Sequence, residues 1–117
     1  MKRDLTLFLD DILESINLIE KYIKNVDFLE FSKKTNIQDS VIRRIEIIGE
    51  ATKNIPQHFR EKYPIVPWKE IAGMKDIITH AYFGIKLDKI WNVIKKDLPK
   101  LKKEINKVIT SQSNKNI

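Results

Sequence analysis

Apolar residues recur every three or four positions along most of this chain, a pattern that predicts amphipathic helices. The first run predicts a helix from about Asp4 to Lys24, with Asp4 as its N-cap. A short helical segment is expected over residues 27–34. A second long helix should begin at Asn36, its expected cap, and end before Pro56. No stretch of the sequence alternates apolar and polar residues as a strand would.

Prolines and glycines interrupt the helical pattern in the middle of the chain. One or two helical turns are expected over residues 57–63, followed by extended chain up to Pro67, which suits the first position of another helix. A further helix should then run from Met74 to about Phe83 and be closed by Gly84. These signals extend the helical pattern into the second half of the sequence.

The last third of the chain completes the expected bundle. Residues 87–94 predict a helix, and Pro99 should begin a new or kinked segment. The pattern as a whole predicts an all-α, up-and-down helical bundle. We expect one domain over residues 1–109 and a disordered polar tail over residues 110–117.

Composition narrows the class of protein. The chain has 117 residues, no cysteine and a formal net charge of +6. The missing thiols exclude disulfides, thiolate metal sites and a cysteine nucleophile, and they fit a cytoplasmic location. No apolar run approaches the roughly 18 residues of a membrane span, so no membrane association is expected. The positive charge favours an anionic partner such as RNA, a nucleotide or an acidic protein.

Lysines cluster near the C-terminal end of the sequence, and two interpretations are open. The cluster is either the solvated face of a helix, which we favour, or part of a surface for an anionic partner. Its members are Lys95, Lys96, Lys100, Lys102, Lys103 and Lys107.

Most candidate chemistry lies between Met74 and Ile85. On a helical wheel the apolar residues of this segment form one stripe that should face the core: Met74, Ile77, Ile78 and Ala81. Lys75 and Tyr82 fall together on one flank of that stripe. Asp76 and His80 fall together on the other flank. Gly73, just before the segment, either breaks the helix or lets it pack tightly, and the sequence leaves both open.

The two flanks suggest different roles. Asp76 can hydrogen-bond the ring of His80, which would fix its tautomer and favour its charged form. Lys75 and His80 point apart by roughly 140°, so one regular helix cannot aim both at a small target. Either the helix distorts or two copies of the segment combine across a dimer interface. An ordinary surface or interface pair is the alternative for Asp76 and His80, and His58 is expected at the surface.

Several blocks of sequence, in order and at compatible spacing, resemble the HepT-like branch of the HEPN superfamily over residues 4–109. The blocks are residues 42–51, 63–68, 71–76, 80–85 and 97–99. The resemblance implies a helical bundle that forms a homodimer. It also implies a ribonuclease toxin encoded beside a minimal nucleotidyltransferase antitoxin.

The active-site motif of that family is an arginine, four residues, a histidine, one residue and a tyrosine. His80 and Tyr82 match it, whereas Lys75 occupies the arginine position. The resemblance implies that His80 is the general acid or base, that Lys75 supplies the cation, and that RNA is cleaved without a metal or cofactor. Asp76 would support His80. Tyr82 would be the site where the antitoxin attaches AMP to silence the toxin.

Lys75 also motivates other functions. Lysine supplies a positive point charge but not the planar fork with which arginine binds a phosphate. One alternative is a non-catalytic HEPN dimer that binds a nucleotidyltransferase partner, RNA or nucleotide. Another is a nucleotide-binding subunit whose partner is the enzyme.

Overall fold

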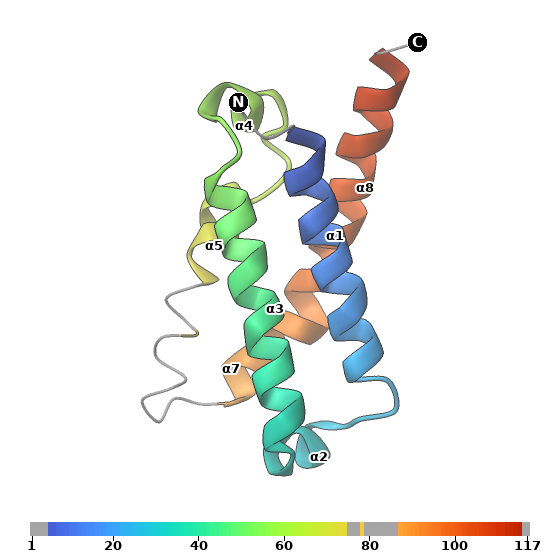
Figure 1. Cartoon of the computed structure of the whole chain (residues 1–117), viewed down its shortest axis with the longest axis vertical. Helices are drawn as coiled ribbons and strands as arrows, with labels where there is room; N and C mark the ends of the chain where they lie inside the picture. Colours follow the sequence, from blue (N-terminus) through green and yellow to red (C-terminus); the bar gives the residue numbers. More distant parts are fainter. Residues whose placement is uncertain (1–4, 75–77, 79–86, 116–117) are drawn as a thin grey trace.

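The structure, a computed structural model, describes residues 5–74, 78 and 87–115 (Figure 1). Within these ranges every regular element is helical, which confirms the all-α prediction. The elements are α1 (Leu5–Tyr22), α2 (Phe28–Lys33), α3 (Thr35–Lys53), α4 (Gln57–Lys62), α5 (Trp68–Ala72), α7 (Leu87–Asn92), the π-helix η1 (Val93–Asp97) and α8 (Leu98–Lys115).

The long helices run alternately up and down the molecule. In Figure 1, α1 descends, α3 rises beside it, and α8 rises on another side of α1. The most extensive helix pair is α1 with α3, and α1 also packs against α8 while α3 packs against α5. The ion pair between Lys102 Nζ and Glu20 Oε1, at 2.7 Å, joins α8 to α1. This arrangement is the up-and-down bundle expected from the sequence.

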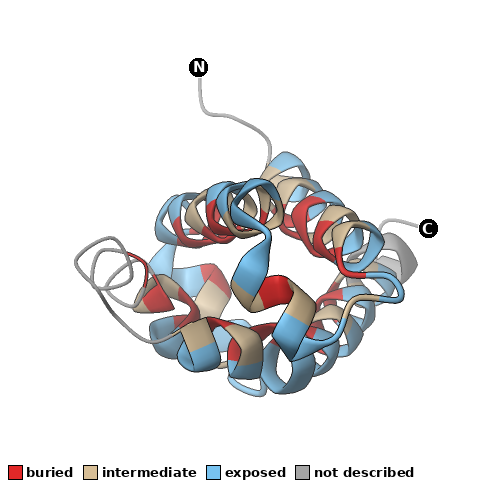
Figure 2. Cartoon of the chain, turned by 90° about the horizontal axis from the view of Figure 1, so that it is seen from below, coloured by how far each residue is buried: buried red, intermediate tan, exposed pale blue. Residues whose placement is uncertain are grey.

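The apolar stripes of the helices face one another inside the bundle. Viewed along its axis in Figure 2, buried positions lie on the inner sides of the helices and exposed positions lie outside. Each fully buried leucine or isoleucine contributes about 1.5–3 kcal/mol, so this core is the main source of stability. The core residues of the three long helices include Leu9, Ile12, Ile16 and Ile19 of α1, Val41, Ile42, Ile45 and Ile48 of α3, and Leu98, Leu101, Ile105 and Val108 of α8.

The start of α3 differs from the prediction. Asn36 is not the N-cap, because α3 already begins at Thr35 and Lys34 occupies the cap position without a side-chain cap bond. Lys34 is also the C-cap of α2, so a single residue separates the two helices. Because the junction is so short, α3 begins before Asn36, the residue best suited to cap it. Asp4, the cap expected for α1, lies outside the described residues.

The expected kink near Pro99 takes the form of a π-helical turn. The backbone N–H of Leu98 donates to the carbonyl of Val93, five residues earlier, and both residues flanking η1 have right-handed helical dihedrals. In a regular α-helix the Pro99 ring would meet the carbonyl of Lys95, four residues earlier. The wider turn stands directly before that position. Helices α7 and α8 are therefore joined without a break.

Helix α8 extends past the domain end expected at residue 109. A disordered tail is expected from Thr110 on composition, whereas α8 continues to Lys115. The Tyr63 hydroxyl donates to Ser111 Oγ at 3.4 Å, so this turn of α8 contacts the chain after α4. A prediction from polar composition alone therefore gives too short a length for α8, because it does not include this tertiary contact. No helix among the described ranges has the length and apolar character needed to cross a membrane.

Candidate functional site

The residues expected to carry chemistry all lie outside the described ranges: Lys75, Asp76, His80 and Tyr82. Two members of the predicted core stripe are described. Met74 is 5% exposed and Ile78 is 3% exposed, which confirms their predicted burial. The other two, Ile77 and Ala81, lie outside the described residues. Helix α5 precedes this segment in the chain and helix α7 comes after it, so these two helices fix its ends.

Helix α5 leads into the segment and is anchored by Trp68. Its side chain is buried, and its indole Nε1–H donates to the carbonyl oxygens of Arg60, at 3.1 Å, and Tyr63, at 3.0 Å. Ile71, one turn later, is 1% exposed. A buried indole normally finds such a partner, because leaving its N–H unpaired is costly. The position of α5 is thus fixed by both packing and hydrogen bonds.

Arg60, which no pattern in the sequence singled out, ties the same region to α3. Its Nε donates to the carbonyl of Ile55 at 2.9 Å, and its Nη2 donates to the carbonyls of Thr52 and Lys53 at 3.0 and 3.3 Å. Thr52 and Lys53 belong to the last turn of α3 and Ile55 follows it, and a cation at the end of a helix complements the helix dipole. Together with the bond from Trp68, Arg60 links the end of α3 to the start of α5.

Gly73 connects α5 to Met74 without a left-handed turn. Its φ is −73° and its N–H donates to the carbonyl of Lys69 at 3.0 Å. A Cβ at this position would lie 3.4 Å from the carbonyl oxygens of Lys69 and Glu70, at the edge of ordinary contact. Of the two roles left open by the sequence, the structure shows the break, because α5 ends at Ala72 and Gly73 is its C-cap. No close approach of another helix to Gly73 is seen among the described residues.

On the far side of the segment, α7 is held by aromatic contacts. The half-buried Trp91 ring lies 5.1 Å from Phe31 and 6.0 Å from Phe28 of α2. Lys95 Nζ lies 5.1 Å from the centroid of the Trp91 ring, within the range of a cation–π contact. Trp68 and Trp91 are thus both packed aromatics. The helices on both sides of the predicted catalytic segment are attached to the core.

A cleft of about 380 Å³ lies between α5 on one side and η1 with the start of α8 on the other. We call it the α5–η1 cleft. It is lined by Pro67, Glu70, Ile71, Met74, Val93, Asp97, Lys100 and Leu101. Its buried apolar members could receive a flat ring, and its exposed carboxylates and ammonium could bind polar groups around that ring. Met74 directly precedes Lys75 in the sequence, so this cleft adjoins the predicted catalytic segment.

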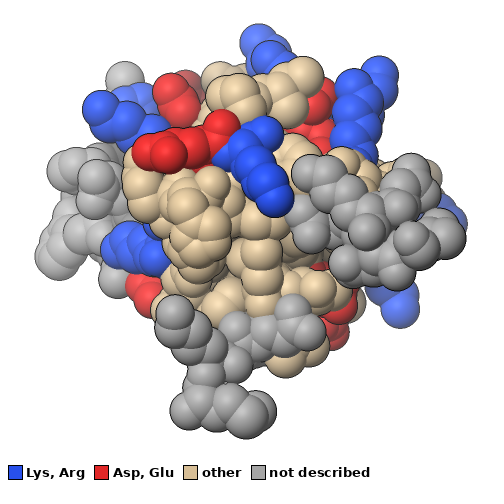
Figure 3. Space-filling view, turned by 90° about the horizontal axis from the view of Figure 1, so that it is seen from above, with Lys and Arg blue, Asp and Glu red and all other residues tan. Residues whose placement is uncertain are grey.

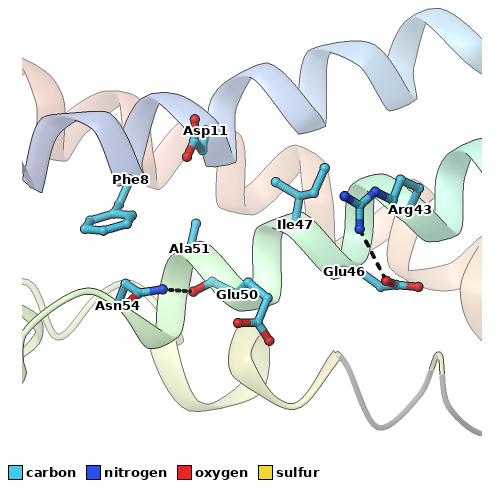
Figure 4. A pocket seen from close by; sticks show the side chains of 8 residues that line it. All are labelled: Phe8, Asp11, Arg43, Glu46, Ile47, Glu50, Ala51 and Asn54. Carbon is cyan, nitrogen blue, oxygen red and sulfur yellow. Dashed lines mark hydrogen bonds and ion pairs between the residues drawn. The ribbon is translucent and has the colours of Figure 1, made fainter. Parts of the chain in front are cut away.

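A second hollow, of about 280 Å³, lies between α1 and α3 (Figure 4). Phe8 and Asp11 come from α1, and Ile47 and Ala51 of α3 point toward that helix. Arg43 Nη1 and Glu46 Oε2 lie 3.7 Å apart within one helix, so that carboxylate pairs locally. The described residues that line this hollow do not include His58, and all of them are far in sequence from the predicted catalytic segment.

Two more polar residues were not anticipated from the sequence. Glu104 is only 7% exposed, and its Oε2 has no hydrogen-bond partner, while Oε1 lies 3.8 Å from Lys107 Nζ. The buried Ser15 Oγ likewise has no partner. The signal for Glu104 was present, because it interrupts an apolar stripe that includes Leu101 and Ile105. Among the described residues no three His, Asp or Glu side chains form a group that could hold a metal ion.

The class of protein follows from a comparison of this helical bundle's sequence with known families. The family model "Ribonuclease HepT-like" matches residues 12–108. The chain therefore belongs to the HepT-like ribonuclease family, as the sequence resemblance implied. The match contains the whole segment with Lys75, Asp76, His80 and Tyr82, and membership supports a ribonuclease.

Named relatives point the same way. A protein of Methanocaldococcus jannaschii named "Gamma-glutamylcyclotransferase and putative RNase" is 53% identical over 99% of this chain, which spans only 53% of that relative. Another from the same organism, named "Putative RNase", is 49% identical over 89% of this chain and 95% of its own length. "Probable ribonuclease HepT" of Thermococcus cleftensis is 44% identical over 92% of this chain and 98% of its own. No solved structure matches the chain at a significant level.

Proposed function

We propose that this chain is a metal-independent endoribonuclease, acting in the cytoplasm as the toxin of a toxin–antitoxin pair. The observation that carries the proposal is the family match over residues 12–108, which spans the His80 and Tyr82 of the family motif. The buried Met74 and Ile78 support it, because they attach the start of that segment to the core. The α5–η1 cleft beside Met74 offers room for part of an RNA substrate.

The proposed reaction is an internal transfer at an RNA phosphate. His80 removes the proton from the ribose 2′-hydroxyl, and the resulting oxygen attacks the adjacent phosphorus. The bond to the 5′-oxygen of the next nucleotide breaks, and that oxygen takes a proton from water while the proton on His80 passes to solvent. The products are a 2′,3′-cyclic phosphate and a 5′-hydroxyl. Lys75 stabilises the negative charge on the phosphorane-like transition state, and Asp76 orients the imidazole of His80.

We further propose that the active unit is a homodimer. Lys75 and His80 diverge on a regular helix, so two protomers are required to bring one of each to the same phosphate unless the helix distorts. The partner that silences the enzyme would be a minimal nucleotidyltransferase that transfers AMP from ATP to the Tyr82 hydroxyl, which loses its proton while pyrophosphate leaves. The added phosphate and nucleoside would place negative charge and bulk on the flank of Lys75, where they compete with RNA.

Cleavage of a labelled RNA by the purified chain tests the proposal, with and without EDTA. We expect His80→Ala to lower the cleavage rate by about 10²–10⁴, the range of general acid–base catalysis. His58→Ala is the matched control, because His58 is the other histidine and lies exposed on α4. Lys75→Arg should raise the rate, since arginine adds a bidentate contact to phosphate. Equal rates for wild type and His80→Ala would contradict the proposal.

AMP transfer is tested separately with the nucleotidyltransferase partner and ATP. Mass spectrometry should find one AMP on the wild-type chain and none on Tyr82→Phe. Modification at another residue would contradict the assignment of Tyr82.

The second candidate is a non-catalytic dimer that binds its partner, RNA or nucleotide, and Lys75 at the arginine position is what favours it. RNA cleavage that appears only in Lys75→Arg would support this alternative. Radiolabelled nucleotide transfer to a small acceptor by the reconstituted pair would instead identify the chain as a nucleotide-binding subunit of an enzyme.

A further inference from the structure

The outer face of η1 and α8 carries an exposed row of lysines. We define the lysine stripe as Lys96, Lys100, Lys103 and Lys107, all of which are exposed. Their spacing of four, three and four residues places successive members near one another on one face of a helix. The opposite face of α8 is buried in the core through Leu98, Leu101, Ile105 and Val108.

Most of this positive charge is left for solvent or a ligand. Within the described part of this face, the one exposed acid is Asp97. Lys107 makes only a long contact of 3.8 Å with the buried Glu104. Lys102, which pairs with Glu20 at 2.7 Å, is half-buried and does not belong to the stripe. The end of the molecule near α4 looks different, because acidic and basic side chains interleave there around an uncharged middle (Figure 3).

The stripe leads to the α5–η1 cleft. Lys100 belongs to both, since it lines the cleft together with Met74 and Asp97. With a rise of 1.5 Å per residue, successive lysines of α8 lie about 4.5–6 Å apart along the helix axis. Such a spacing lets neighbouring ammonium groups meet successive phosphates of an extended single strand.

We propose that the lysine stripe binds the phosphate backbone of single-stranded RNA and directs one base into the α5–η1 cleft. The inference rests on the proposed ribonuclease function for its choice of anion. The buried side chains of Ile71 and Met74 give the cleft an apolar surface for the flat base. Glu70 and Asp97 can accept hydrogen bonds from amino groups on the edge of the base, whereas phosphates are held by the lysines.

The surface fits RNA better than an anionic membrane. A helix that lies on a membrane inserts large apolar side chains beside its lysines. The exposed large apolar residues of the described ranges are Leu7, Phe28, Leu29 and Ile65, and none belongs to η1 or α8. The stripe therefore offers charge without an apolar rim, which suits a solvated polyanion.

Fluorescence anisotropy with a labelled single-stranded RNA tests the proposal, using the full chain with His80→Ala to prevent cleavage. The test variant adds Lys100→Gln, Lys103→Gln and Lys107→Gln. The matched control adds Lys24→Gln, Lys33→Gln and Lys53→Gln, which remove the same charge from lysines elsewhere. We expect the test variant to weaken binding about tenfold or more. It should also reduce the slope of log Kd against log salt by about 2, because three phosphate contacts are lost.

Equal losses in the two triple variants would overturn the proposal, because binding would then follow net charge alone. Binding to vesicles containing phosphatidylserine that depends on the stripe, with RNA binding unaffected, would also overturn it. The two proposals can fail separately. If cleavage requires His80 but is unchanged in the stripe variant, this inference alone is wrong. If RNA binding depends on the stripe but no RNA is cleaved, the ribonuclease function alone is wrong.

Discussion

At the scale of single residues, the structure assigns to Arg60 a role that periodicity does not reveal. Its guanidinium donates to three carbonyls at or beyond the end of α3, and its own carbonyl accepts from Trp68. These hydrogen bonds of Arg60 could be predicted only by knowing how the chain turns at Pro56, because that turn brings α4 back toward α3. By contrast, the burial of Met74 and Ile78 followed directly from their spacing in the sequence.

Arg60→Ala should lower the free energy of unfolding by about 2 kcal/mol, because several carbonyls lose a charged donor. Arg60→Lys should cost about 1 kcal/mol, since a single ammonium cannot reproduce the fork. Urea denaturation measures both changes. Arg43→Ala is the control, because its exposed pairing with Glu46 at 3.7 Å is worth well under about 1 kcal/mol. An effect of Arg60→Ala as small as that of the control would refute the capping role.

At the scale of elements, the sequence predicted which helices exist better than where they begin and end. The first helix, the short helix after Asp27 and the turns after Pro56 were all anticipated. Asn36 failed as a cap because the single residue Lys34 joins α2 to α3. The turn before Pro99 was expected as a kink, but its π-helical form depends on how α7 and α8 both reach the core. The geometry of such junctions depends on tertiary packing, which cannot be predicted from local helix propensity.

The junction between α5 and Met74 gives a prediction at this scale. Gly73→Ala should raise the free energy of unfolding by about 0.4–1 kcal/mol, because the native φ suits alanine and the unfolded chain loses freedom. Thermal and urea unfolding would measure the gain. Ala72→Gly, one residue earlier in α5, should change stability in the opposite direction by about 1 kcal/mol. A loss on Gly73→Ala would mean that the carbonyls of Lys69 and Glu70 cannot accommodate a Cβ.

At the scale of the whole molecule, the bundle and its family could be inferred from the sequence, whereas the dimer stays a prediction. Ordered blocks of sequence pointed to the HepT-like family, and the match over residues 12–108 establishes it. A partner surface depends on side chains from two copies of the chain, which no periodicity within one copy specifies. The divergence of Lys75 and His80 is a reason to propose a dimer.

Mixing two inactive variants tests a shared site. Lys75→Ala and His80→Ala chains should each cleave RNA poorly, whereas their mixture should recover up to about a quarter of wild-type activity. Half of the dimers would then be mixed, and one of the two sites in each would be intact. The His58→Ala chain mixed with His80→Ala serves as the control for exchange of protomers. A mixture with no recovery, despite exchange seen by native mass spectrometry, would place Lys75 and His80 in one protomer.

The π-helical turn sets the angular relation between the two ends of the last helical rod. A π-helical turn contains one residue more than an α-helical turn. It therefore rotates the side chains of α7 about the helix axis by about 100° relative to a continuous α-helix. Uniform winding would swing the Trp91 indole away from Phe31 while Lys100 stayed in place. The extra residue of the π-helical turn therefore lets Trp91 contact Phe31 while Lys100 lines the cleft.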